Sequence, residues 1–269
     1  MISGQITNAR LRRKNDRELA YKKKGVPCQD AFRSEKIDSG EIIVAVADGL
    51  GSAEHSEIGA KIAVNTAVDK IKSLFTNIDG YGIPAAALMK NRDIIVEAFS
   101  ASRTALENYA GDNGYPLRKL ACTLIVAFTW EGYLATGHIG DGAVTALIED
   151  EIRIISDPGN SEYVNEVTPL TSGKIEDNIR INENIPDVRV FAAFTDGCQR
   201  AFLVRKNGEY LPYEPFFRPI FTYAKDVADE EEASGEIVRF LESDKMNENS
   251  DDDKTLVIAV PEKGEDHPV

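Results

Sequence analysis

Residues 41–50, EIIVAVADGL, decide the fold of this chain. Six apolar residues, most of them β-branched, end at the turn dipeptide Asp48-Gly49, which predicts a buried strand followed by a tight turn. Residues 56–75 come next and repeat apolar side chains at helical spacing, so we expect a helix that begins at Ser56. The apolar positions of that helix are Ile58, Ile62, Ala63, Ala67, Ile71 and Leu74.

The rest of the chain continues this mixture of helices and strands. A second helical pattern covers residues 84–109, and residues 215–241 look helical in two pieces. Short apolar runs at 122–130, 133–139, 143–148 and 151–155, joined by tight polar turns, predict an antiparallel meander. Runs at 188–194 and 255–260 predict two more strands. The pattern indicates an α+β fold, and because the last strand returns to the core we expect a single domain over residues 1–269.

Length, composition and charge narrow the function. The chain has 269 residues, 42% of them hydrophobic, and a formal net charge of −14. This acidity opposes binding to nucleic acid, and no apolar run is long enough for a membrane span. The N-terminal residues have no apolar signal core, so we expect a cytoplasmic protein. Cys28, Cys122 and Cys198 are too scattered for a disulfide framework and read as free thiols.

A basic cluster near the N-terminus departs from the overall acidity. Two readings of it stay open: a solvated surface segment, or a rim that attracts an anionic substrate. Its members are Arg10, Arg12, Arg13, Arg17, Lys22, Lys23 and Lys24.

Aspartates recur at the ends of the predicted strands. Asp48, Asp141 and Asp196 each follow an apolar run and precede a glycine, and Asp251–Asp253 immediately precede the last run. Each Asp-Gly alone is an ordinary turn signal. If the strands are neighbours, however, the carboxylates converge, which is costly unless they are protonated or bind cations. Such hard oxygen ligands suit magnesium or manganese.

Five short motifs occur in a fixed order. They are GVPCQDA at 25–31, VADGLGS at 46–52, GHIGDG at 137–142, AFTDG at 193–197 and DDKTLVI at 252–258. In this order and spacing the chain resembles the metal-dependent protein phosphatase family, type 2C, in its short bacterial form, over about residues 20–260. The resemblance implies a four-layer αββα sandwich: two antiparallel sheets packed face to face, each flanked by a helix pair.

The resemblance also implies a reaction and a set of site residues. The reaction is hydrolysis of phosphoserine and phosphothreonine in a phosphorylated protein, opposing a serine/threonine kinase, by a water activated between two Mn²⁺ or Mg²⁺ ions. Asp48 would bridge both ions, the Gly49 carbonyl would bind one, and Asp196 and Asp252 would complete the other. Asp30 would hold water bound to the metal, and Asp141 matches the position of a third, weaker ion. Asp48, Asp196 and Asp252 are thus the predicted catalytic residues.

Two features of that family are missing. The arginine that grips substrate phosphate in many members is Gly25 here, and a histidine that some members place after the bridging aspartate is Leu50. For His55 and His138 a structural or surface role is favoured over a catalytic one. Residues 157–187 form a long polar stretch that is either a surface loop or a lid. The alternatives to a protein phosphatase are a weak or inactive module that binds a phosphoprotein or kinase, and a phosphohydrolase acting on small molecules.

Overall fold

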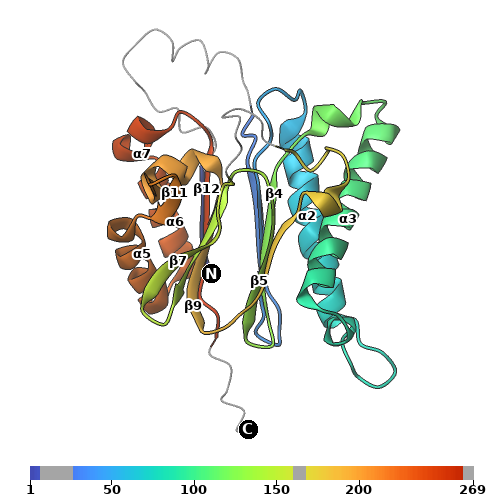
Figure 1. The fold of residues 1–269 in the computed structure, drawn as a ribbon, viewed down its shortest axis with the longest axis horizontal. Helices are drawn as coiled ribbons and strands as arrows, with labels where there is room; N and C mark the ends of the chain where they lie inside the picture. Colours follow the sequence, from blue (N-terminus) through green and yellow to red (C-terminus); the bar gives the residue numbers. More distant parts are fainter. Residues whose placement is uncertain (7–26, 160–167, 263–269) are drawn as a thin grey trace.

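The computed structural model describes residues 1–6, 27–159 and 168–262 and shows four layers (Figure 1). Two five-stranded sheets pack face to face in the middle, and helices cover the outer face of each. The predicted αββα sandwich of antiparallel sheets is therefore confirmed. The basic cluster at residues 10–24 and Gly25 lie outside the described residues.

One sheet has the strand order β1-β12-β9-β6-β7 and the other the order β2-β3-β4-β5-β8. Every neighbouring pair is antiparallel. The strands are β1 (Ile2–Ile6), β2 (Ala31–Lys36), β3 (Ile42–Ala47), β4 (Leu124–Trp130), β5 (Tyr133–Ile139), β6 (Ala143–Ile148), β7 (Glu151–Ser156), β8 (Arg180–Ile185), β9 (Val188–Phe194) and β12 (Lys254–Ala259). A separate hairpin pairs β10 (Leu203–Lys206) with β11 (Glu209–Pro212).

Helices α2 (Ser56–Thr76) and α3 (Asn91–Asp112) cover the β2–β8 sheet. Helices α5 (Glu214–Asp226), α6 (Glu230–Leu241) and the short α7 (Asp244–Asn249) lie on the other side of the molecule. The predicted helices at 56–75 and 215–241 are confirmed. The pattern at 84–109 corresponds to a 3-10 turn, Ala85–Leu88, followed by α3.

Successive side chains of the central strands point to opposite faces of the sheets and contribute to three hydrophobic cores. In β3, Ile43, Ala45 and Ala47 face the helices α2 and α3, whereas Ile42, Val44 and Val46 face the opposite sheet. Strands β9 and β12 divide their side chains in the same way between the sheet–sheet core and the layer of α5 and α6. Because both faces of these strands are covered, their sequences are continuously apolar rather than alternating.

The predicted meander is wrong at one point. Strands β4 and β5 pair, and β6 and β7 pair, but β5 and β6 belong to different sheets. Gly140, with φ of 120°, and Asp141 lie where the chain crosses from one sheet to the other. Successive strands joined by a short connection usually pair, and the signal against pairing here was the glycine on either side of Asp141.

Several strands on or outside the sheet edges were not predicted, although the edge strand β7 was. The unpredicted strands are β1, β2, β8 and the β10–β11 hairpin, which are short or polar. The polar stretch 157–187 contains the edge strand β8 and a 3-10 turn, Ile175–Asp177. Residues 160–167 lie outside the described part.

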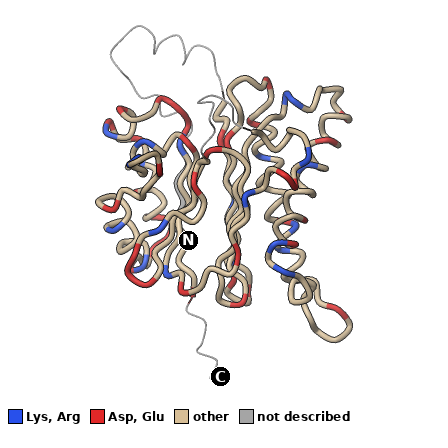
Figure 2. Tube along the Cα trace, viewed as in Figure 1, with Lys and Arg blue, Asp and Glu red and all other residues tan. Residues whose placement is uncertain are grey.

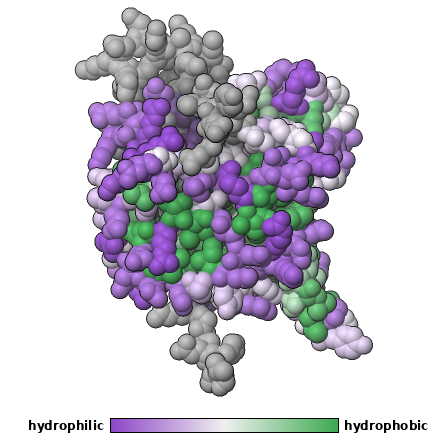
Figure 3. Space-filling view, in the orientation of Figure 1, coloured by the Kyte–Doolittle hydropathy of each residue, from purple (hydrophilic) through white to green (hydrophobic). Residues whose placement is uncertain are grey.

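The surface includes one apolar loop far from the strand ends discussed below. It joins α2 to α3 and carries Ile78, Tyr81, Ile83 and Leu88, with Tyr81 91% exposed. In Figure 3 apolar side chains lie along this projection at the lower right, behind a paler tip. Among the described helices, none has the length and apolar character needed to cross a lipid bilayer.

Candidate metal centre

The predicted aspartates gather at one edge of the two sheets. Asp48 follows β3, Asp141 lies between β5 and β6, and Asp196 follows β9 in a 3-10 turn, Asp196–Cys198. Asp252 precedes β12. In Figure 2 acidic residues lie at the upper edge, where strands of both sheets end.

Three of these carboxylates come together directly. Asp48, Asp141 and Asp196 each offer an oxygen, and these oxygens all lie within 4.8 Å of one another. Asp252 is more exposed and stands outside this triplet, but its charge acts on all three members. The sequence therefore found four acidic residues that share one electrostatic environment.

Burial and mutual repulsion raise the pKa of the triplet. Burial is the largest cause for each member, and neighbouring aspartates add to it. The pKa of Asp196 rises to about 8. The pKa values of Asp48 and Asp141 are also raised above the ordinary value of an aspartate. Without a counter-charge, the folded protein disfavours three ionised carboxylates so close together.

Asp30 lies beneath the triplet and is fully buried. Its Oδ2 accepts hydrogen bonds of 2.7 Å from the hydroxyls of Thr195 and Thr255. Burial raises its pKa to about 7, while these two hydroxyls and Asp48 act in the opposite direction. The two hydroxyls thus fix the direction of the Asp30 carboxylate, which also interacts with Asp48.

Glycines allow the backbone to approach closely around the centre. A Cβ on Gly49 would lie 2.7 Å from atoms of Ser56, and one on Gly197 only 1.9 Å from the Asp253 carbonyl oxygen. The amide of Gly49 donates to the Gln29 carbonyl over 3.0 Å, which holds the turn after β3 in place. The Asp-Gly pairs are therefore needed for packing as well as for turning.

The structure adds several polar contacts around the centre that the motifs did not predict. The buried Asp253 accepts a hydrogen bond of 2.8 Å from the Gln29 amide. Gln199 donates its side-chain amide to the Asp141 carbonyl, and Arg180 donates to the carbonyl of Gly140 over 2.6 Å. Gln199 and Arg180 belong to no motif, and the β8 sequence that carries Arg180 gave no strand signal.

His55 and His138 both have structural surroundings. His138 is buried in β5, with Nδ1 2.9 Å from the Ser156 hydroxyl. Burial is the main reason that its pKa is held well below the usual value. The ring of His55, just before α2, stacks on Tyr115 with centroids 4.4 Å apart.

The donor set fits a hard divalent cation. It consists of carboxylate oxygens, and the Asp196 Oδ1 atom is buried with no hydrogen-bond partner among the described residues. An orphaned buried carboxylate oxygen is costly unless something binds it. A cation would satisfy this atom and offset the repulsion within the triplet.

The cysteines lie beside this arrangement as buried thiols, and the Cys28 Sγ is 3.8 Å from the Asp30 carbonyl oxygen. Cys28, Cys122 and Cys198 are buried and form no disulfide, as predicted. Burial raises the pKa of all three thiols, to about 12 for Cys28.

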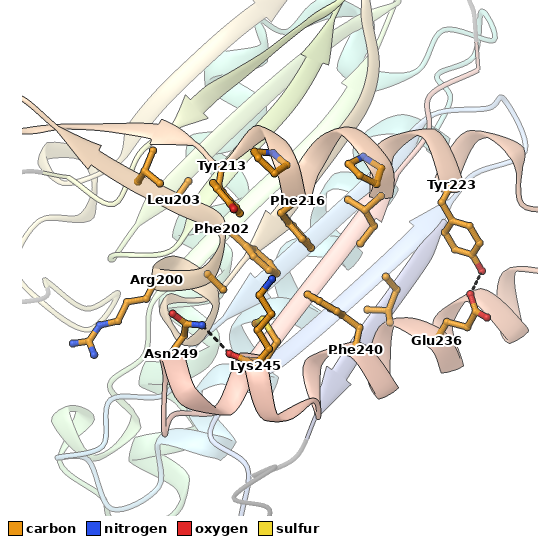
Figure 4. A pocket seen from close by; sticks show the side chains of 17 residues that line it. Arg200, Phe202, Leu203, Tyr213, Phe216, Tyr223, Glu236, Phe240, Lys245 and Asn249 are labelled. Atoms are coloured by element: carbon orange, nitrogen blue, oxygen red, sulfur yellow. Dashed lines mark hydrogen bonds between the residues drawn. The ribbon is translucent and has the colours of Figure 1, made fainter.

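A concavity of about 640 Å³ lies elsewhere, among α5, α6, α7 and the short helix α4 (Gln199–Phe202) (Figure 4). Phe202, Phe216 and Phe240 stack along it, with ring centroids 3.9 and 5.4 Å apart. Its lining holds none of the six residues predicted to bind metal.

Comparison with known proteins gives the same assignment as the motifs. The sequence model of the family described as Protein phosphatase 2C matches residues 20–242. Serine/threonine-protein phosphatase 3 of Escherichia coli (strain K12) is 28% identical over 241 residues, which cover 87% of this chain and 91% of that protein.

Solved structures share the fold. A bacterial serine phosphatase matches with a TM-score of 0.58 at 16% identity, over 98% of this chain and 99% of that one. The catalytic domain of the serine/threonine protein phosphatase PstP, solved with two manganese ions, gives 0.56 at 12% identity, over 96% of each chain. The family match covers most of the sequence, and the chain therefore belongs to the protein phosphatase 2C family of enzymes.

Proposed function

We propose that this phosphatase hydrolyses phosphoserine and phosphothreonine in proteins, with divalent cations held by its buried carboxylates. The observation that carries the proposal is the convergence of the Asp48, Asp141 and Asp196 oxygens within 4.8 Å. Both the E. coli relative and PstP are described as serine/threonine phosphatases, which supports this substrate class.

Each predicted residue has a proposed role. Asp48, on the buried end of β3, would contact both of two cations, and the Gly49 carbonyl would contact one. Asp196 and Asp252 would complete the other site, and Asp141 would support a third ion. Manganese or magnesium suits such oxygen ligands, and PstP was solved with two manganese ions.

Bound cations would supply a water of lowered pKa and would offset the charge that develops on the phosphoryl oxygens. The chain's own residues place the carboxylates. The hydroxyls of Thr195 and Thr255 fix the direction of the Asp30 carboxylate, which would hold the attacking water by accepting a hydrogen bond from it.

The wider setting is also part of the proposal. The sheet–sheet core is shared by residues from β3 to β12, which supports a single phosphatase domain over residues 1–269. We place its activity in the cytoplasm, opposite a serine/threonine kinase, with no role for nucleic acid.

The test measures hydrolysis of p-nitrophenyl phosphate and of a phosphothreonine peptide with and without Mn²⁺. We compare the wild type, Asp48→Asn and Asp112→Asn, which makes the same change at an exposed residue of α3. We expect metal-dependent turnover that is nearly abolished in Asp48→Asn and unchanged in Asp112→Asn. Equal activity in all three proteins would refute the metal centre.

A second candidate is a catalytically weak module that binds a phosphoprotein or a kinase. Gly25, in place of the arginine that grips substrate phosphate in many members, favours it, and Leu50, in place of a histidine, is consistent with slow turnover. Tight Mn²⁺ binding without turnover of any phosphoester would favour this candidate. Turnover of nucleotides or sugar phosphates alone would point to a small-molecule phosphohydrolase.

A further inference from the structure

Arg180 stands at the end of β8 and contacts the crossover that carries Asp141. Its Nη2 donates to the Gly140 carbonyl over 2.6 Å and to the Asp157 carbonyl over 3.3 Å. Gly140 is the first residue after β5, and Asp157 is the first residue after β7, which belongs to the other sheet. One guanidinium thus joins backbone segments from the two sheets next to a predicted metal ligand.

The same Nη2 atom of Arg180 also contacts the imidazole ring of His138. It lies 3.0 Å from Nδ1 and 3.1 Å from Nε2 of the imidazole. An in-plane position equidistant from both nitrogens would collide with Cε1 between them, so Nη2 lies over the ring face. His138 is in turn held by the Ser156 hydroxyl. A planar guanidinium can stack on a ring and bond two carbonyls together, which an ammonium does less well.

Little freedom remains at the crossover. A Cβ on Gly140 would lie 2.5 Å from Thr123, so the backbone there is tightly packed. On the far side, Gln199 donates to the carbonyl of Asp141 itself. Arg180 and Gln199 therefore hold the backbone on both sides of the Asp141 α-carbon, and from this position the Asp141 carboxylate reaches Asp48 and Asp196.

One nitrogen of the Arg180 side chain is buried in an unfavourable way. Its Nε is buried and has no hydrogen-bond partner among the described residues, and an unsatisfied buried donor is unfavourable. Its contacts go to the crossover and to the imidazole beneath it. The positive charge of Arg180 also acts on Asp141.

We propose that Arg180 is a positioning residue that holds the Asp141 carboxylate in the metal triplet through the Gly140 carbonyl. This inference rests on the proposed function, since it concerns cation binding at the same centre. Groups that orient metal ligands typically change metal affinity about 10-fold to 100-fold when altered.

The experiment is a double-mutant cycle between Arg180→Lys and Asp141→Asn, with Arg153→Lys as control. Arg153 lies on β7 and its guanidinium pairs with Glu151 at the surface. Mn²⁺ binding is measured by isothermal titration calorimetry and turnover with p-nitrophenyl phosphate. We expect Arg180→Lys and Asp141→Asn each to weaken the same Mn²⁺ binding step by about 10-fold or more. We expect the double variant to be no weaker than Asp141→Asn alone, and Arg153→Lys to match the wild type.

Additive losses in the double variant, or Mn²⁺ binding unchanged in Arg180→Lys, would overturn the inference. If Arg180→Lys does not fold, Arg180→Gln takes its place; failure of both to fold would show a role in stability alone and would also overturn it. Absence of Mn²⁺ binding in the wild type is a different result, because it defeats the proposed function itself.

Discussion

The carboxylates of Asp48 and Asp196 come from different sheets, yet they offer oxygens within 4.8 Å of each other. Neither β3 nor β9 could bring this pair together without the face-to-face packing of the two sheets. The packing that forms the hydrophobic core therefore also creates the electrostatic strain that a cation can relieve.

This strain predicts a pH-dependent stability in the metal-free protein. The pKa of Asp196 is about 8 when folded, above its ordinary value of 3.8, so the folded state binds the proton more tightly. Its contribution is fully favourable below pH about 4 and is lost as pH rises toward 8. In EDTA, we expect Asp196→Asn to melt higher than wild type by a margin that grows from pH 5 to 8 and then levels off. Calorimetry at each pH measures this margin, and a margin independent of pH would contradict the prediction.

The hydroxyls around Asp30 give a second prediction. In Thr255→Val the buried Asp30 loses a donor, and we expect a loss of about 1–3 kcal/mol in the free energy of unfolding. The matched control is Thr145→Val. Thr145 is 0% exposed, and its hydroxyl has no hydrogen-bond partner among the described residues, so its loss should be neutral or stabilising. Urea titrations compare the two, and equal losses would show that the bond to Asp30 is unimportant.

Gly197 provides a third prediction. Its missing Cβ would lie 1.9 Å from the Asp253 carbonyl oxygen, so Gly197→Ala must displace either the Asp196 turn or the start of β12. We expect a destabilisation of about 1–3 kcal/mol together with weaker Mn²⁺ binding. Gly111→Ala, in α3 with open space around it, should instead stabilise by about 0.4–1 kcal/mol. Thermal melts and Mn²⁺ titrations check both variants, and similar behaviour of the two would count against a tight turn at Asp196.

A fourth prediction concerns the thiols. Because all three cysteines are buried and their pKa values are raised, iodoacetamide at pH 7.5 should leave the native phosphatase unmodified and active. Mass spectrometry and an activity assay over the same hours give the result. Loss of turnover in step with alkylation of Cys198 would mean that a thiol takes part in the chemistry.

Much of the fold could be predicted because the central strands are buried on both faces. Strands β5, β6 and β9 have the bounds expected from their apolar runs. No residue of the edge strand β8, RINENI, is buried, so its sequence carries no apolar run. The crossing at Asp141 was missed because a short connection between two strands normally means that they pair.

The candidate centre was predicted more fully than its surroundings. Aspartates at strand ends give a repeated signal, and three of them converge. The residues that hold them, such as Gln199 and Arg180, act through backbone carbonyls. Any sequence supplies a carbonyl, so no motif could reveal these partners before the crossover was seen.

The most direct test of the metal centre is an anomalous difference map from crystals soaked in Mn²⁺ and measured at the manganese absorption edge. We expect two or three strong peaks, the first of them within coordination distance of both Asp48 and Asp196. A map with strong peaks only elsewhere on the molecule, or with none at these carboxylates, would contradict the account.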